Sequence, residues 1–166
     1  MTAYRAGGAG KQADNQDDDN ELDDAFRAVM EGLRTTLPGV QVLFAFLLTM
    51  PLQPGFAELD SLDRDVFYLA FASSALASVL LITPSVHQRI RAPISGLRRR
   101  TARHVFVAIR IANAGTVIAA VALSASVYLV TSLVFGDRAG AVAAGVLALV
   151  TAWAWFYLPM VAFRHR

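Results

Sequence analysis

Four long apolar stretches, separated by shorter polar or charged segments, dominate the pattern along the chain. They cover residues 39–56, 66–86, 111–135 and 139–161, and none of them contains Asp, Glu, Lys or Arg. Each stretch is close to the ~20 apolar residues that an α-helix needs to cross a bilayer. The pattern therefore predicts an all-α fold, an integral membrane bundle of four transmembrane helices within a membrane domain over residues 38–163.

The segment before the first span, residues 21–37, has a different periodicity. Its carboxylates gather at the start, where they favour the helix dipole. Its apolar residues recur every three or four positions, which places them on one stripe of a helix, and they are Leu22, Phe26, Val29, Met30, Leu33 and Leu37. We expect an N-terminal amphipathic helix that lies along the inner membrane surface. Docking onto the basic loop or a partner subunit remains open.

Residues 1–20 are rich in Gly, Ala, Asn and Asp and contain little that could be buried. A segment of this composition cannot offset its ordering entropy, so the sequence predicts a disordered acidic tail. Such a tail could bind a basic partner, although a solvated tail is the simpler interpretation.

The predicted connections differ in length and chemistry. Pro51 and Pro54 lack backbone donors, so we expect a kink or an early helix end near them. The turn at residues 136–138 is so short that the third and fourth spans must be antiparallel neighbours. The acidic segment with Glu58, Asp60, Asp63 and Asp65 does not match a calcium-binding loop and is expected to be a solvated outer loop.

Small residues recur at four-residue spacing in two of the predicted spans. In a bilayer, small residues at this spacing let helix backbones approach closely. The sequence therefore predicts helix-packing faces in the second and fourth spans, formed by Ala70, Ser74 and Ser78 and by Gly140, Ala144 and Ala148.

Basic residues concentrate between the second and third spans. Cytoplasmic loops of membrane proteins carry an excess of Lys and Arg, and the two termini carry basic flanks as well, so both termini and this loop are predicted to be cytoplasmic. So close to a span, the nearest partners of these side chains are anionic lipid headgroups, and nucleic acid is disfavoured. The expected headgroup contacts are Arg98, Arg99, Arg100, Arg103 and Arg110.

Little in the sequence indicates catalytic chemistry. The chain has no cysteine, and its spans contain no ionisable residue away from their ends, which argues against proton relays and coupled transport. His87 and His104 lack metal-ligand spacing. Arg110 and Asn113 share a helix face and could bind a lipid phosphate or a buried acid, although snorkelling of Arg110 to the interface is the simpler interpretation. We expect no cofactor, no metal and no enzymatic activity.

Three segments carry a resemblance to a known family. They are LPGVQVLFAFLLT at residues 37–49, the F-x-x-L-x-x-x-x-RDV run at 56–66, and TPSVHQRI at 83–90. With the Arg-rich loop and two further spans, the chain resembles a family of small four-span actinobacterial membrane proteins defined as a domain of unknown function. The resemblance implies a bacterial plasma-membrane location and supplies no activity.

These observations favour a non-enzymatic membrane protein, structural or accessory, that assembles with itself or a membrane partner through small-residue faces. A small transporter or channel subunit is the alternative, and it would need an oligomer around an axis. A lipid-active enzyme would need a polar cluster at the cytoplasmic interface, for which Arg110, Asn113 and His104 are the only candidates.

Overall fold

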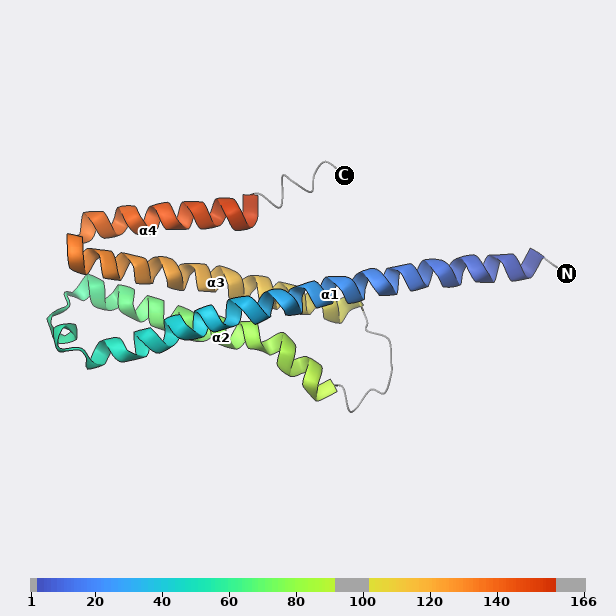
Figure 1. Ribbon diagram of the computed structural model, residues 1–166, viewed down its shortest axis with the longest axis horizontal. Coiled ribbons are helices and arrows are strands. Elements are labelled where there is room, and N and C mark those ends of the chain that lie inside the picture. Colours follow the sequence, from blue (N-terminus) through green and yellow to red (C-terminus); the bar gives the residue numbers. More distant parts are fainter. Residues whose placement is uncertain (1–2, 92–101, 158–166) are drawn as a thin grey trace.

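The structure is a computed structural model that describes the backbone of residues 3–91 and 102–157. The side chains of residues 3–15, 17–19, 22, 23, 88–91, 102–104, 156 and 157 lie outside the description. The described part is all-α (Figure 1). Its elements are α1 (Ala3–Thr49), the short 3-10 helices η1 (Met50–Leu52) and η2 (Pro54–Glu58), α2 (Ser61–Arg91), α3 (Ala102–Phe135), α4 (Asp137–Ala152) and a π-helical turn, η3 (Trp153–Tyr157).

The prediction of four membrane-crossing helices is confirmed. By length and composition the candidate spans within the described residues are Asp24–Leu52, Ser61–His87, Val105–Phe135 and Asp137–Trp155. They are the helices of a multi-pass membrane protein. The structure describes the chain only as far as residue 157, so the predicted inner end of the fourth span, residues 158–161, lies outside the described part.

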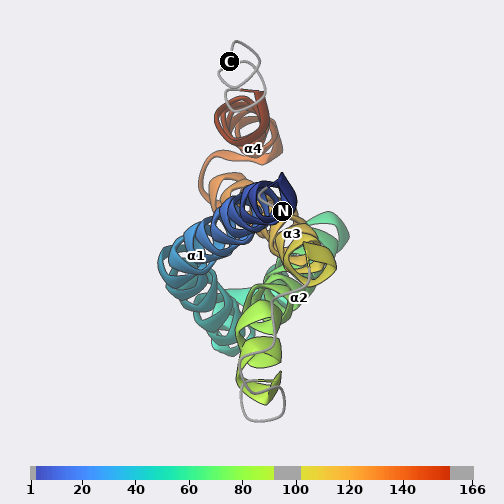
Figure 2. The ribbon, with the colours of Figure 1, turned by 90° about the vertical axis from the view of Figure 1, so that its right-hand side faces the viewer.

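The first three helices pack around a common interior, and α4 lies against α3 alone (Figures 1 and 2). Apart from Ser73, the buried positions of α2 alternate between steps of four and three residues, which is the spacing of a coiled-coil seam. They are Asp63, Phe67, Ala70, Ser74, Ala77, Leu81 and Pro84. On α1, the buried residues Phe26, Leu33, Val40 and Leu47 recur every seventh position. These two seams meet α3 in two core clusters.

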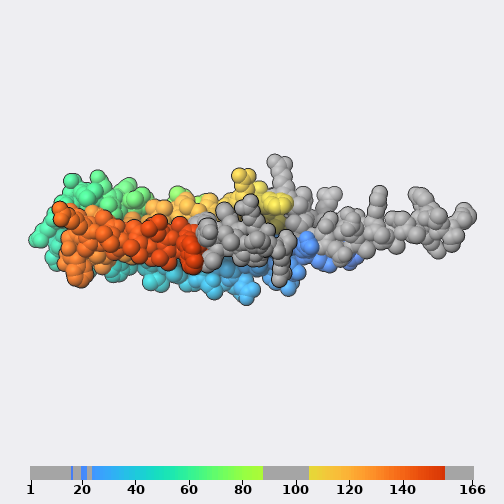
Figure 3. All heavy atoms as spheres, turned by 90° about the horizontal axis from the view of Figure 1, so that it is seen from above, coloured from blue at the N-terminus to red at the C-terminus, as the bar shows by residue number. Residues whose placement is uncertain are grey.

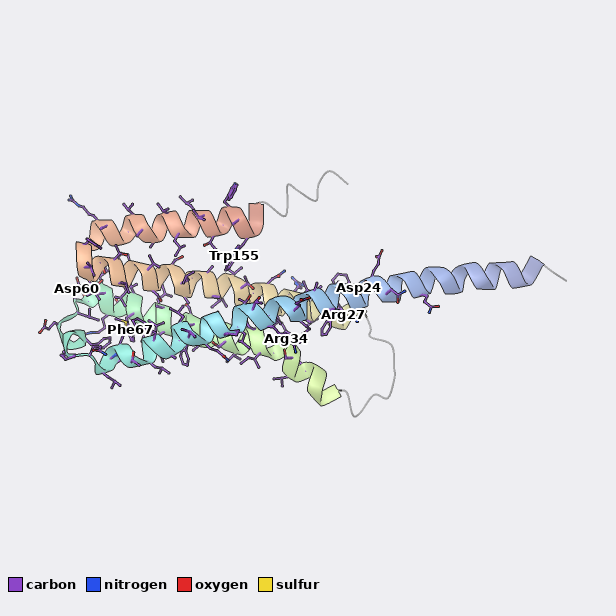
Figure 4. All side chains as sticks on the ribbon, viewed as in Figure 1. Asp24, Arg27, Arg34, Asp60, Phe67 and Trp155 are labelled. Carbon is purple, nitrogen blue, oxygen red and sulfur yellow. The ribbon has the colours of Figure 1, made fainter. Side chains whose placement is uncertain are left out.

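One core cluster joins Leu33 and Val40 of α1 with Leu81 of α2 and Ala112 of α3. The other lies nearer the opposite end of the bundle and is built around Leu47, Phe67 and Leu129. In this second cluster Phe56 of η2 meets the ring of Phe67 edge-on, with ring centroids 4.9 Å apart. Figure 4 shows Phe67 between the helices near that end. This aromatic contact fixes the connection between α1 and α2 to the bundle.

The structure differs from the sequence prediction along α1. Residues 21–37 continue into the first span as one helix through Pro38, and Val29, Met30, Leu33 and Leu37 pack into the core instead of facing the membrane surface. Buried contacts on both sides of Pro38, at Leu33 and Val40, hold the two halves in one helix. Residues 3–20, expected to be disordered, form helical turns continuous with α1, since extending an existing helix requires no new nucleus.

The C-terminal ends of the first two helices differ from the predicted ends of the first and second spans. The α-helix α1 ends at Thr49, because Pro51 and Pro54 start new 3-10 turns instead of continuing the α-helix. α2 continues through Pro84 to Arg91, beyond the end predicted at residue 86. Figure 1 shows that the last part of α2 bends away from α3.

The connection between α3 and α4 is a single residue, Gly136. Its φ of 88° lies in the left-handed region that favours glycine. The predicted antiparallel pairing of the third and fourth spans is confirmed. One turn into α4, Gly140 lies so close to α3 that a Cβ there would stand 3.0 Å from the Tyr128 carbonyl oxygen and 3.1 Å from Ser132.

Replacing Gly140 by alanine is expected to lower the free energy of unfolding by about 1–3 kcal/mol, because the new methyl group overpacks the α3–α4 contact. Thermal or SDS unfolding followed by circular dichroism in detergent would measure the change. Gly145→Ala is the matched control, since a Cβ at residue 145 would meet nothing within 4 Å. Equal destabilisation by both substitutions would contradict the close contact at Gly140.

Candidate functional site

The first turn of α2 holds a polar cluster at the end of the bundle where the chain turns twice. Asp60 precedes the helix, and its Oδ1 accepts a hydrogen bond from the backbone N–H of Asp63 at 2.7 Å. This is an N-terminal cap, which satisfies one of the free donors of the first turn. Figure 4 shows Asp60 at this end, beside the loop that joins α1 to α2. The cap holds Asp63 where its side chain faces α3.

Asp63 links α2 to α3. Its Oδ1 accepts a hydrogen bond from Ser132 Oγ at 3.0 Å, and the same hydroxyl lies 3.0 Å from the Leu129 carbonyl oxygen of its own helix. Only 8% of Asp63 and 7% of Ser132 are exposed. The expectation that residues 58–65 form a solvated loop is therefore wrong for Asp63, which occupies a buried position of the α2 seam.

The rest of that acidic segment faces outward. Glu58, Asp60 and Asp65 are exposed, as is Asp137 at the start of α4. Within the described ranges, 3–91 and 102–157, no three His, Cys, Asp or Glu residues are placed to hold one metal ion. The Asp63–Ser132 hydrogen bond is thus an interhelical contact at the rim of the bundle, and it fixes the register of α2 against α3.

The residues expected to contact lipid headgroups are only partly described. Arg98, Arg99 and Arg100 lie outside the described residues, as does the side chain of Arg103. Arg110 lies on α3 inside the candidate span and is exposed, and Asn113 is exposed one turn further along. Neither side chain makes a hydrogen bond or ion pair with any residue that the structure describes.

An apolar groove runs between α4 and the α2–α3 pair. It is an open, shallow groove with a volume of about 520 Å³. Val66 and Leu69 of α2 form one wall, Val117 to Tyr128 of α3 form the floor, and Ala144 to Ala152 of α4 form the other wall. Figure 3 shows α4 lying along the middle of the molecule, with α2 on one side and α1 on the other.

The two small-residue faces predicted from the sequence have different environments. Ala70 and Ser74 are fully buried in the seam of α2, and Ser78 is half-buried beside them. On α4, Gly140 is buried against α3, whereas Ala144 is half-buried, Ala148 is exposed, and both line the groove. The α2 face therefore serves packing within the chain, and most of the α4 face is left uncovered by protein.

A third small-residue face, on α1, was missed from the sequence. Gly32 and Gly39 are exposed, and a Cβ at either position would meet nothing within 4 Å. Ala28 and Thr35 are exposed four residues before each of them. The signal that could have found this face is the four-residue spacing itself, which the larger apolar stripe of α1 obscured.

Comparison with known proteins bears on the chain as a whole. A family model described as a family of unknown function, DUF6328, matches residues 15–159. The chain belongs to DUF6328. No curated protein and no solved structure matches it. The DUF6328 match begins in the N-terminal turns of α1 and ends just beyond η3, so it includes the Asp63–Ser132 contact, the groove and the α1 face.

In this DUF6328 chain, Ser132→Ala is expected to lower the free energy of unfolding by about 1–3 kcal/mol, because a buried carboxylate loses its interhelical partner. Chemical unfolding in detergent micelles, followed by tryptophan fluorescence, would measure the loss.

The control is Ser126→Ala. Ser126 is equally buried, but its hydroxyl bonds only the Ala122 carbonyl oxygen of its own helix at 2.8 Å. A loss at Ser126 as large as that at Ser132 would show that the bond to Asp63 adds nothing to stability.

Proposed function

We propose that this protein is a non-enzymatic accessory protein of the plasma membrane that assembles with a second copy of itself through the exposed small-residue face of α1. The observation that carries the proposal is the open space beside Gly32 and Gly39. Glycine in a helix interior is less stable than alanine by roughly 0.5–1 kcal/mol. No neighbour within the described part of the chain requires glycine at either position.

The arrangement of the face suits close helix pairing. Ala28, Gly32, Thr35, Gly39 and Val42 are all exposed and recur at steps of three and four residues. They lie on a flank of α1 beside the stripe of Leu33 and Val40, which pack into the core. Apolar side chains gain little from leaving lipid for protein, so transmembrane helices associate where small residues allow their backbones to approach. This face of α1 meets that requirement.

The hydroxyl groups of Thr35 and Thr36 on α1 do not oppose such pairing. Thr35 and Thr36 both donate to the Gly32 carbonyl oxygen, at 2.9 and 3.0 Å. Their hydrogen-bonding needs are met within the helix, so they can be covered by another helix without leaving a donor unpaired. The face therefore consists of small side chains, and its hydroxyl groups already have hydrogen-bond partners within α1, so it behaves as an apolar surface.

The same proposal includes an orientation with both termini and the basic loop in the cytoplasm. Arg27 and Arg34 on α1 lie toward the end of the bundle opposite Asp60, as Figure 4 shows. α2 ends and α3 begins at the same end, and the Arg-rich stretch lies between them in the sequence. Among the described residues, Arg64 and Arg138 are the arginines at the other end. The bias of basic residues toward one end supports cytoplasmic placement of that end.

Gly32→Leu and Gly39→Leu, singly and together, are expected to abolish most of the dimer, because a leucine side chain would hold the two α1 helices apart. Light scattering and cross-linking of the full chain in several mild detergents would measure the dimer fraction. Ala45→Leu is the matched control, since Ala45 is exposed on α1 but lies off the small-residue face. A wild-type protein that stays monomeric in all detergents would overturn the proposal.

The orientation can be tested with single cysteines, since the chain has none of its own. A membrane-impermeant thiol reagent applied to intact cells is expected to label Ser61→Cys and to leave Asn20→Cys unlabelled. Both positions are exposed, and lysed cells should show labelling of both. Labelling of Asn20→Cys alone in intact cells would reverse the assigned orientation.

A further inference from the structure

One face of α3 connects the groove to Arg110 and Asn113. Residues 110, 113, 117, 124 and 128 follow one another at steps of three, four or seven, so they share one side of the helix. Val117, Ser124 and Tyr128 form part of the groove floor. Arg110 and Asn113 therefore lie in line with the groove, one to two turns beyond its inner end.

Arg110 is placed where a charged side chain needs a partner. It lies inside the candidate span Val105–Phe135, is exposed, and makes no ion pair or hydrogen bond with the described residues. Ionisable residues within membrane spans are costly and usually pair with another group. Guanidinium donors match phosphate oxygens in a bidentate geometry, and the Asn113 amide adds two further donors nearby.

The groove is suited to an acyl chain. Its walls are almost wholly apolar, and beside Gly145 there is open space, since a Cβ there would meet nothing within 4 Å. From Val117 to Tyr128 the floor extends about 16 Å at 1.5 Å per residue. This length is about half of a ~30 Å hydrocarbon core, the depth that one acyl chain fills.

The groove also presents two hydroxyl groups, Thr151 at its inner part and Ser124 on its floor. Neither hydroxyl has a hydrogen-bond partner among the described residues. No buried side-chain oxygen of the described residues lacks a partner, so the Thr151 hydroxyl is accessible from the groove. It can donate to an ester carbonyl oxygen that enters between the headgroup position and the groove.

We propose that this groove binds one anionic phospholipid from the leaflet on the Arg110 side, with its phosphate at Arg110 and Asn113 and an acyl chain along α3 and α4. Charge complementarity favours a lipid over a second copy of the chain. A neighbouring helix could fill the apolar part, whereas a lipid with an anionic head and an apolar tail satisfies Arg110 and the groove with a single ligand.

The test uses the full chain in mild detergent, titrated with phosphatidylglycerol or phosphatidylcholine and followed by native mass spectrometry. The wild-type protein is expected to retain one phosphatidylglycerol more tightly than phosphatidylcholine. Arg110→Gln should weaken phosphatidylglycerol binding about tenfold or more, since hydrogen bonds to charged groups contribute roughly 1.5–3 kcal/mol. Gly145→Leu should reduce retention of both lipids by filling the groove.

Two control variants keep the result interpretable. Arg34→Gln removes an exposed arginine at a similar depth, since its neighbour Leu33 shares a core cluster with Ala112. Ala141→Leu enlarges an exposed residue of α4 that does not line the groove. Both controls should bind phosphatidylglycerol like the wild type.

Three outcomes would overturn the lipid site. If Arg34→Gln lost as much phosphatidylglycerol binding as Arg110→Gln, any exposed positive charge at this depth would be sufficient to bind the lipid. Unchanged lipid retention in Gly145→Leu would exclude the groove, and loss of dimer in that variant with no change in bound lipid would identify a second copy as the occupant. The Gly32→Leu and Gly39→Leu variants, which test assembly, lie on a different helix face, so either proposal can fail without the other.

Discussion

Close packing along the buried seam of α2 is the contact on which the arrangement of the other helices depends. Within lipid there is little hydrophobic gain in bringing helices together, so dispersion between closely approaching surfaces must hold them. Ala70, Ser74 and Ala77 are fully or almost fully buried and are small enough to admit α1 on one side and α3 on the other. The molecule is therefore a three-helix core to which α4 is added through α3.

The addition of α4 through one neighbour explains the unequal ends of the molecule. At the rim near Asp60, the Gly136 turn, the close contact at Gly140 and the bond between Asp63 and Ser132 hold three helices together. Toward the other end, α4 has only α3 beside it, and α2 bends away (Figures 1 and 2). The groove runs between these two ends of the bundle. Polar contacts close it near Asp60, and at its other end it leads to Arg110.

The fold class, the four apolar helices and the antiparallel α3–α4 pair could be predicted because each rests on local composition or chain length. The course of α1 could not, because Pro38 and the polar residues around it suggest a boundary. Only the core contacts of Leu33 and Val40 override that local signal. The same limit applies to Asp63: its neighbours are acidic and exposed, and its burial follows from the seven-residue spacing with Ala70 and Ala77 rather than from its own type.

The candidate sites divide in the same way. Arg110 and Asn113 could be recognised as a pair from their spacing on one helix, and the small residues of α4 could be recognised from theirs. Their relation to each other depends on how α4 lies over α3, which no local pattern specifies. The open face of α1 could not be predicted either, because the sequence does not show whether a neighbouring group lies beside a glycine.

The single-residue connection at Gly136 also constrains how the chain enters the membrane. With one residue between the two helices, α4 begins as soon as α3 ends. The connection is therefore too short for α3 to insert separately before α4 is synthesised. The two helices are therefore expected to insert as one hairpin. In the proposed orientation its tip crosses the membrane with the charges of Asp137 and Arg138, which offset each other. In that orientation, translocation of the hairpin would move almost no net charge through the hydrocarbon, so its insertion would be nearly independent of the membrane potential.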